Sequence, residues 1–390
     1  MPLPRFLRAY YAYAFLFDFM LGYAIYTVYF QLSGLDVWGI ALLFAIWSVV
    51  AAVFEIPSGA LADHFDRRWQ MMAAPLIKAA AFVIWALAGG SFALFAFGFI
   101  VWSFADSLVS GCKQALLYEH MEAAGQAEDY DRVLGRDRAI VEISAGVALI
   151  LGGIVGHFSM PLALWLAVPP LALASIIAFW LPDIRIRPDK GEEEPGYLSH
   201  FSEALGEFRR SADLRFITGY LTLGIMLFGV LDEFDPLYYL AVGMPIWSFG
   251  LIGALAIAAY AAANVSAHRF AGFRAGGWLF PMAAGCLLLM AGLAESAWLL
   301  IPLMMAYICA APVWVLGEAK FQRVMGGASR ATTTSTMMFF HCLASIAMSL
   351  AIGGLAFAIG IVPAYGWCGA YLIAFSAWAW WRDRKGQSAI

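Results

Sequence analysis

Long apolar runs separated by short polar breaks follow one another along almost the whole chain. Twelve of these runs have about the 20 mostly apolar residues that a membrane-spanning helix needs. They cover about residues 7–31, 37–61, 70–88, 92–119, 134–157, 160–182, 214–241, 246–267, 277–294, 297–322, 331–359 and 362–381. The breaks contain turn formers, as at Ser33-Gly34 and Gly243-Met244-Pro245. The pattern predicts an all-α membrane protein with twelve transmembrane helices.

One connection differs from the others because it is long and hydrophilic. Residues 183–212 combine acids, bases and prolines, and they separate the runs into two sets of six. We therefore expect an N-terminal six-helix bundle over residues 1–182, a linker over 183–212 and a C-terminal six-helix bundle over 213–390. Two six-helix pseudo-repeats are typical of transporters, whose binding site lies between the repeats near the middle of the membrane.

The basic residues lie at the termini, in the linker and in every second connection. Of the 23 lysines and arginines, only Lys78 and Lys113 lie inside apolar runs away from the run ends. Basic residues concentrate in cytoplasmic connections, so both termini are expected in the cytoplasm. We expect a multi-pass protein of the bacterial inner (plasma) membrane.

Composition narrows the class of protein further. Hydrophobic residues make up 63% of the chain and charged residues 13%, against about a quarter charged in soluble proteins. The net charge of −4 indicates no nucleic-acid partner. The five cysteines form no CxxC pair, and we find no metal-binding, nucleophile or phosphate-loop motif. We therefore expect no enzyme activity, cofactor or metal; a membrane enzyme or non-transporting receptor is a remote alternative.

Residues 59–68, with the sequence GALADHFDRR, form a charged segment between the second and third runs. The segment resembles the cytoplasmic loop signature G-x-L-A-D-x-x-G-R-R of the major facilitator superfamily, and Asp66 replaces the last glycine. The matching residues include Gly59, Asp63, Arg67 and Arg68. Residues 54–58, 110–119 and 330–332 resemble a drug- and metabolite-exporter-like branch. The resemblance implies the twelve-helix major facilitator fold and transport by alternating access.

The resemblance also implies a cytoplasmic gate. In the family, the signature aspartate meets the N-terminus of helix 11, and the signature arginine pairs with an acid that ends helix 4. Carried over, Asp63 would face the helix that begins near Thr332, and Arg67 would pair with Glu119; Arg330 in the basic loop before that helix belongs to the same gate motif. These contacts would close the cytoplasmic side; the alternative is a basic loop that only sets orientation.

The fifth run lacks the G-P-x-x-G-G signature that proton-coupled exporters often carry. It has Gly152, Gly153 and Gly156 instead, with no proline between them. The small-xxx-small spacing of Gly152 and Gly156 predicts close packing against another helix.

Ionisable residues inside membrane helices are functional candidates because burying them costs free energy. Asp18 lies about 16 Å into the first run, near the midplane, and is the first candidate for a proton or cationic-substrate site. Its alternative is a carboxylate capped by neighbouring helices, for example through Lys78. Lys78 is expected on a peripheral helix, snorkelling or ion-paired. Asp106 is a coupling candidate, with a hydrogen bond to Ser103 or Ser107 as the alternative.

Two further candidates lie in the second half. Asp232 and Asp235 are three residues apart, share a helix face and precede Pro236. The pair either shares a proton, because two close carboxylates disfavour each other's charge, or forms an exposed acidic helix end. His341 is either a proton relay or a packing residue.

These observations predict a secondary active transporter for a small amphiphilic or cationic organic solute, by proton-coupled efflux. Proton- or sodium-coupled uptake of an organic metabolite or metal chelate is the alternative. We expect the partners to be the solute, the coupling ion and the lipid bilayer, and the protein to be a monomer.

Overall fold

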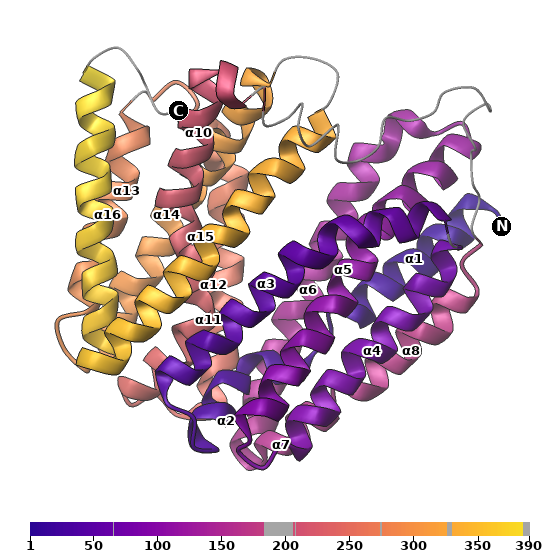
Figure 1. Ribbon diagram of the computed structural model, residues 1–390, viewed down its shortest axis with the longest axis horizontal. Coiled ribbons are helices and arrows are strands. Elements are labelled where there is room, and N and C mark those ends of the chain that lie inside the picture. Colours follow the sequence, from indigo (N-terminus) through magenta and orange to yellow (C-terminus); the bar gives the residue numbers. More distant parts are fainter. Residues whose placement is uncertain (65, 183–205, 207, 274, 326–329, 385–390) are drawn as a thin grey trace. The chain divides into compact units, whose positions relative to one another are not determined.

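The computed structural model describes the backbone of residues 1–64, 66–182, 206, 208–273, 275–325 and 330–384 (Figure 1). Within these ranges, the side chains of residues 55–64, 111, 330–332 and 335 are outside the description. The described residues form α-helices joined by short turns, with two interruptions by 3-10 and π turns inside spans, and they contain no strand. The predicted all-α class is confirmed.

Among the described residues, eleven helical segments are long and apolar enough to cross a membrane. The first half contains α1 (Leu3–Phe17), α2 (Tyr26–Leu32), α3 (Val37–His64), α4 (Arg67–Leu87), α5 (Phe92–Ala123), α6 (Tyr130–Phe158), α7 (Met160–Trp165) and α8 (Val168–Phe179). The second contains α10 (Ala212–Tyr220), α11 (Met226–Ala241), α12 (Ile246–Ser266), α13 (Gly276–Ala291), α14 (Leu300–Val324), α15 (Arg330–Ile359) and α16 (Ile361–Arg384). The predicted run 277–294 corresponds to α13, which has 16 residues and is shorter than the other spans.

The chain forms two compact units. The first comprises Met1–Lys190 and Pro245–Leu255, and the second Gly191–Met244 and Ala256–Ile390. In the first unit α4 packs against α5 and α8, and α1 packs against α6 and α8. In the second unit α13 packs against α14 and α16, and α11 packs against α15 and α16.

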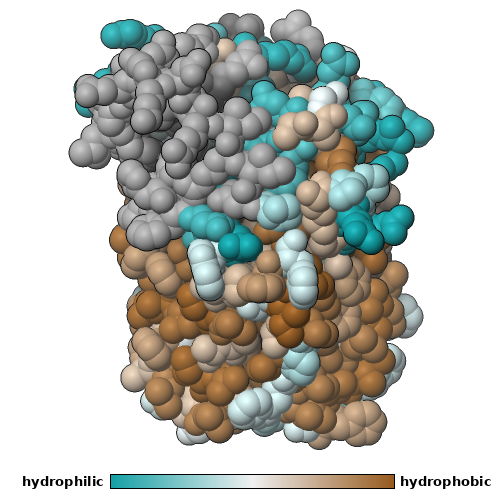
Figure 2. All heavy atoms as spheres, turned by 90° about the vertical axis from the view of Figure 1, so that its right-hand side faces the viewer, coloured by the Kyte–Doolittle hydropathy of each residue, from teal (hydrophilic) through white to brown (hydrophobic). Residues whose placement is uncertain are grey.

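Large apolar side chains remain exposed along the helices. Phe158 is 82% exposed and Trp298 79% exposed. Figure 2 shows hydrophobic residues covering most of one face, while hydrophilic residues gather toward one end. Because exposed apolar patches of this extent mark a contact with something other than water, the surface fits a bilayer that solvates the helices.

The first span is not one continuous helix, although its sequence predicts one. Helix α1 ends at Phe17, Asp18 is its C-cap, and the chain continues through the 3-10 turn η1 (Leu21–Ala24) into α2. Helix α6 passes close to this break because its glycines leave room: a Cβ at Gly152 would overlap the Leu21 carbonyl. Such breaks at membrane depth are tolerated where the backbone is buried in protein or lines a cavity.

The remaining glycines of the predicted packing set also lie at close approaches. A Cβ at Gly156 would meet the Ile25 side chain at 2.8 Å. A Cβ at Gly153 would lie 2.9 Å from the backbone nitrogen of Gly250, which belongs to the same unit. The close packing inferred from the Gly152/Gly156 spacing therefore involves a 3-10 turn and the start of α2 rather than a regular partner helix.

The span that begins the second half is also interrupted, by the π turn η3 (Leu221–Ile225) between α10 and α11. Helix α16 covers this turn. The Tyr371 hydroxyl donates a 2.7 Å hydrogen bond to the Leu223 carbonyl, and a Cβ at Gly224 would overlap the Phe375 ring. Single π turns inside α-helices are frequent at functional sites.

Candidate functional site

Three charged side chains of the first unit meet midway along their membrane spans. Asp18 ends α1, Lys78 lies in the middle of α4, and Asp106 in the middle of α5. The Lys78 Nζ atom is 2.9 Å from Asp106 Oδ1 and 3.9 Å from Asp18 Oδ1. We call these three residues the charged triad.

The cation of the triad is buried, whereas its carboxylates are accessible. The Lys78 side chain is 1% exposed, but those of Asp18 and Asp106 are 25% and 29% exposed. The Phe17 ring centroid lies 4.2 Å from the Lys78 Nζ atom, and Trp102 contributes a second ring at 5.7 Å. Aromatic faces attract ammonium groups, most strongly where water is excluded. The ammonium is therefore held in place, while each acid keeps part of its side chain exposed.

The position of Asp18 explains why a cation is needed there. A helix C-terminus carries partial negative charge, so a carboxylate at the end of α1 is disfavoured by the helix dipole. Lys78 supplies the compensating charge, and its place midway along α4 keeps its ammonium away from both membrane surfaces. With two acids and one base, the triad carries one carboxylate in excess. It can therefore accept one proton or one cation and become electrically balanced.

The structure decides between alternatives that the sequence left open for these residues. Lys78 is on α4, yet it points to the triad instead of toward the periphery, so the ion-paired alternative holds and snorkelling does not. Neither serine near Asp106 bonds to it: Ser103 donates to the Trp47 carbonyl, and Ser107 to the Ser103 carbonyl. The capping of Asp18 through Lys78, left open by the sequence, is the arrangement found.

A second ion pair in the first unit was not anticipated. Lys113 on α5 and Asp137 on α6 lie 2.9 Å apart, with side chains 15% and 8% exposed. The Lys113 Nζ atom also lies 5.4 Å from the centroid of the Tyr10 ring. The position of Lys113 inside an apolar run is the sequence feature that could have indicated an ion pair. No feature of the sequence distinguishes Asp137 as its partner from the other charged residues at the start of α6.

The predicted gate is described in part. The Arg67 guanidinium donates a 2.6 Å hydrogen bond to Glu119, joining the start of α4 to the C-terminal part of α5, the pairing that the resemblance implied. Arg68 lies 3.3 Å from Asp66, which caps α4 through the Arg68 backbone N–H. The side chains of Asp63 and Arg330 and the surroundings of Gly59 fall outside the description. The expected contact between Asp63 and the start of α15, which is the eleventh predicted span, therefore stays a prediction.

In the second unit the structure separates the two predicted acids. Asp232 is exposed, whereas Asp235 is buried at 6% exposure. Asp235 accepts hydrogen bonds from Tyr365 on α16 at 2.7 Å and from Tyr239 at 3.2 Å. Pro236 lies within α11 without ending it. The acids therefore have different surroundings, and tyrosine hydroxyls were the missed partners of Asp235.

His341 is buried at 2% exposure on α15, with its ring centroid 5.6 Å from that of Trp314. Its Nε2 atom has no hydrogen-bond partner among the described residues. The described residues also contain no group of three or more histidine, cysteine, aspartate or glutamate side chains placed to hold a metal ion.

Comparison with known proteins places this architecture in a family. The family model of the Major Facilitator Superfamily matches residues 9–349 of the chain. No curated protein sequence matches it.

Solved structures of transporters share the fold. A point mutant of the nucleoside transporter NupG matches with a TM-score of 0.80 and 13% identity, covering 95% of this chain and 98% of that one. A bacterial homologue of the human lysosomal transporter Spinster, in an inward-facing and unoccupied conformation, matches with a TM-score of 0.78, 14% identity and coverage of 98% and 97%. The human organic anion transporter MFSD10 matches with a TM-score of 0.63, 15% identity and coverage of 97% and 99%. At these identities the likeness concerns the fold alone.

Proposed function

Because the chain belongs to the Major Facilitator Superfamily and is therefore a membrane transporter rather than an enzyme, we propose that it exports a small amphiphilic or cationic organic solute in exchange for protons. The observation that carries this proposal is the charged triad, in which two accessible acids share one buried ammonium. Intramembrane acids of this kind mark proton and substrate pathways.

The excess carboxylate gives the coupling a physical basis. With the triad unprotonated, its net negative charge attracts a cationic group, and that attraction is strong because the surroundings are apolar. When a proton binds to Asp18 or Asp106, the triad becomes neutral and the attraction for the cation is lost. Proton and solute thus compete for the same charge, which is what exchange across a membrane requires.

The Arg67–Glu119 pair supports a role for the loop between α3 and α4 in alternating access. We propose that this pair, with Asp63 and the start of α15 near Arg330, closes the cytoplasmic side. Opening that side would require the contacts to separate. The cytoplasmic location of both termini and of this loop is part of the same proposal.

The alternative is uptake of an organic metabolite or metal chelate, coupled to protons or sodium. It is favoured by the absence of the exporter signature in α6, where Gly152, Gly153 and Gly156 occur without a proline. An excess carboxylate would bind either coupling ion. The direction of solute movement and the identity of the ion separate the two candidates.

The test is proton flux in inverted membrane vesicles, read with a pH-sensitive dye after a proton gradient is established. The compounds are amphiphilic cations, antibiotics, organic anions and nucleosides, the last two chosen because structural neighbours are described as transporters of them. We expect at least one compound to dissipate the gradient with the wild-type protein and not with Asp18→Asn or Asp106→Asn.

Asp129→Asn is the matched control, because this acid lies at the surface with a side chain 57% exposed. It should behave as the wild type. Full compound-driven flux in both triad variants would refute the triad as the coupling site. Solute accumulation in right-side-out vesicles, without an effect in inverted ones, would favour uptake. If transport required sodium, the coupling ion would be sodium and not the proton.

A further inference from the structure

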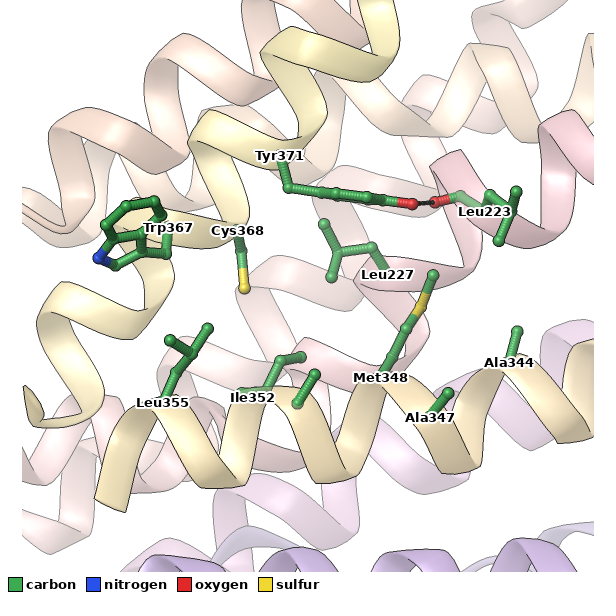
Figure 3. Close-up of a pocket in the computed structure, with 11 residues that line it drawn as sticks. Leu223, Leu227, Ala344, Ala347, Met348, Ile352, Leu355, Trp367, Cys368 and Tyr371 are labelled. Carbon is green, nitrogen blue, oxygen red and sulfur yellow. Dashed lines mark hydrogen bonds between the residues drawn. The ribbon is translucent and has the colours of Figure 1, made fainter. Parts of the chain in front are cut away.

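We propose that the second unit contains a binding site for the acyl chain of a membrane lipid, in a pocket beside the π turn η3. The pocket has a volume of about 320 Å³ and lies between η3 with α11, the middle of α15 and α16 (Figure 3). All three segments belong to membrane spans. The site is separate from the charged triad and does not depend on the proposed direction or coupling of transport.

The chemistry of the lining selects for an apolar occupant. Leu227, Met348, Ile352 and Leu355 provide its aliphatic walls, with alanines between them on α15. The Tyr371 hydroxyl is the principal polar group, and it already donates its proton to the Leu223 carbonyl (Figure 3). A polar ligand would leave its own groups without partners there, at a cost in free energy. An alkyl chain has no such groups.

The rim of the pocket is open toward exposed apolar side chains. Trp367 is 61% exposed, Tyr371 42% exposed and Leu223 50% exposed. At membrane depth, exposed side chains of this kind contact lipid. Apolar cavities are not stably filled by water, so the molecules available to enter from this side are the hydrocarbon chains of the bilayer.

The size of the pocket fits part of one chain. An apolar cavity of about 150 Å³ binds one benzene molecule, and this pocket, at about 320 Å³, is roughly twice as large. It therefore has room for a segment of one acyl chain but not for a whole lipid. We therefore assign the site to a single acyl chain whose headgroup remains outside the pocket.

The position beside η3 distinguishes this pocket from the general lipid-facing surface. Leu223 is part of the π turn, and Leu227 lies on the first turn of α11 that follows it. A bound chain would contact the span that begins the second half where its regular hydrogen-bond pattern is interrupted. Tyr371 contacts both the pocket and the turn, so it links occupancy of the site to that segment.

The test is photocrosslinking of the full-length protein in lipid nanodiscs. A small and increasing fraction of the lipid is a phospholipid with a diazirine in one acyl chain, and adducts are quantified by mass spectrometry. We expect adducts on α16 residues 367–371 whose yield saturates at a low probe fraction. Ala351→Phe, which places a ring into the pocket from α15, should lower this yield at least fivefold.

Ala358→Phe is the matched control because Ala358 is exposed on the same helix but does not line the pocket. It should change the yield less than twofold. Ala347→Phe fills the pocket from another position and keeps the test valid if Ala351→Phe does not fold. A yield that rises in proportion to the probe fraction and is equal in all variants would indicate bulk lipid contact only and would overturn the proposal. So would the absence of adducts on residues 367–371.

Discussion

Replacing Lys78 by methionine tests how strongly the charged triad holds the first unit together. Methionine keeps most of the length of the side chain and removes its charge. The substitution leaves two carboxylates, Asp18 and Asp106, near each other without the cation that now separates them. We expect a large loss of folding stability, because an ion pair broken in a buried site leaves an uncompensated charge.

The magnitude follows from the two distances. At an effective dielectric constant of ~20, unit charges attract by about 6 kcal/mol at the 2.9 Å separation of Lys78 from Asp106 and about 4 kcal/mol at the 3.9 Å separation from Asp18. Removing ions from water offsets much of this, and loss of one partner of a buried pair typically costs about 3–5 kcal/mol. The partial exposure of both acids places our expectation at about 3 kcal/mol, the low end of that range.

The assay is equilibrium unfolding in detergent micelles, compared with the double variant Lys78→Met/Asp106→Asn. The double variant should recover most of the lost stability, because the unpaired carboxylate at 2.9 Å is replaced by a neutral amide. Lys113→Met, which removes the contact with Asp137 alone instead of contacts with two acids, should cost less. Wild-type stability for Lys78→Met, or a double variant less stable than the single one, would refute the reasoning.

Three further substitutions test other contacts. Gly152→Ala should destabilise the protein by about 1–3 kcal/mol, because the added Cβ has no room. Gly146→Ala on the same helix, where the space is open, should leave the stability unchanged; gel filtration and thermal unfolding compare the two variants. A double-mutant cycle of Arg67→Gln and Glu119→Gln should give a coupling energy of about 0.5–3 kcal/mol, and independent effects would contradict the observed pair. Tyr371→Phe should lower the unfolding free energy by about 1 kcal/mol, and an unchanged value would argue against its bond to the π turn.

Much of the fold could be predicted from the sequence because membrane-length apolar runs are a strong signal. Among the described residues, spans and breaks appear near their expected positions, and run 277–294 corresponds to the shorter helix α13. The interruptions at Asp18 and at η3 could not be predicted, because both lie in continuous apolar runs without a proline at the break. They depend on neighbours distant in sequence, such as Gly152 and Tyr371.

The candidate site was predictable as a set of residues but not as an arrangement. The cost of burying charge singled out Asp18, Asp106 and Lys78, but the sequence left open whether Lys78 snorkels or pairs with an acid. The direction in which the Lys78 side chain points depends on how α4 is rotated about its own axis. Hydrophobic periodicity determines this rotation poorly in a helix that is apolar on most sides. Asp235, like the triad, was predicted because it is a charged residue inside a membrane span. Its partners Tyr239 on α11 and Tyr365 on α16 are uncharged, so the same argument could not identify them.

The break in the first span bears on how the protein is made. The most apolar 18-residue window of Leu3–Leu32 has a mean hydropathy of only 1.3, and 67% of that window is buried inside the protein. The carboxylate of Asp18 at its centre is compensated by Lys78, which the ribosome adds only after α3 is complete. During synthesis the first span therefore enters the membrane with a charge that has no partner yet. We expect it to remain beside the insertion machinery until α4 arrives, so that the first three spans are released into the bilayer as a group.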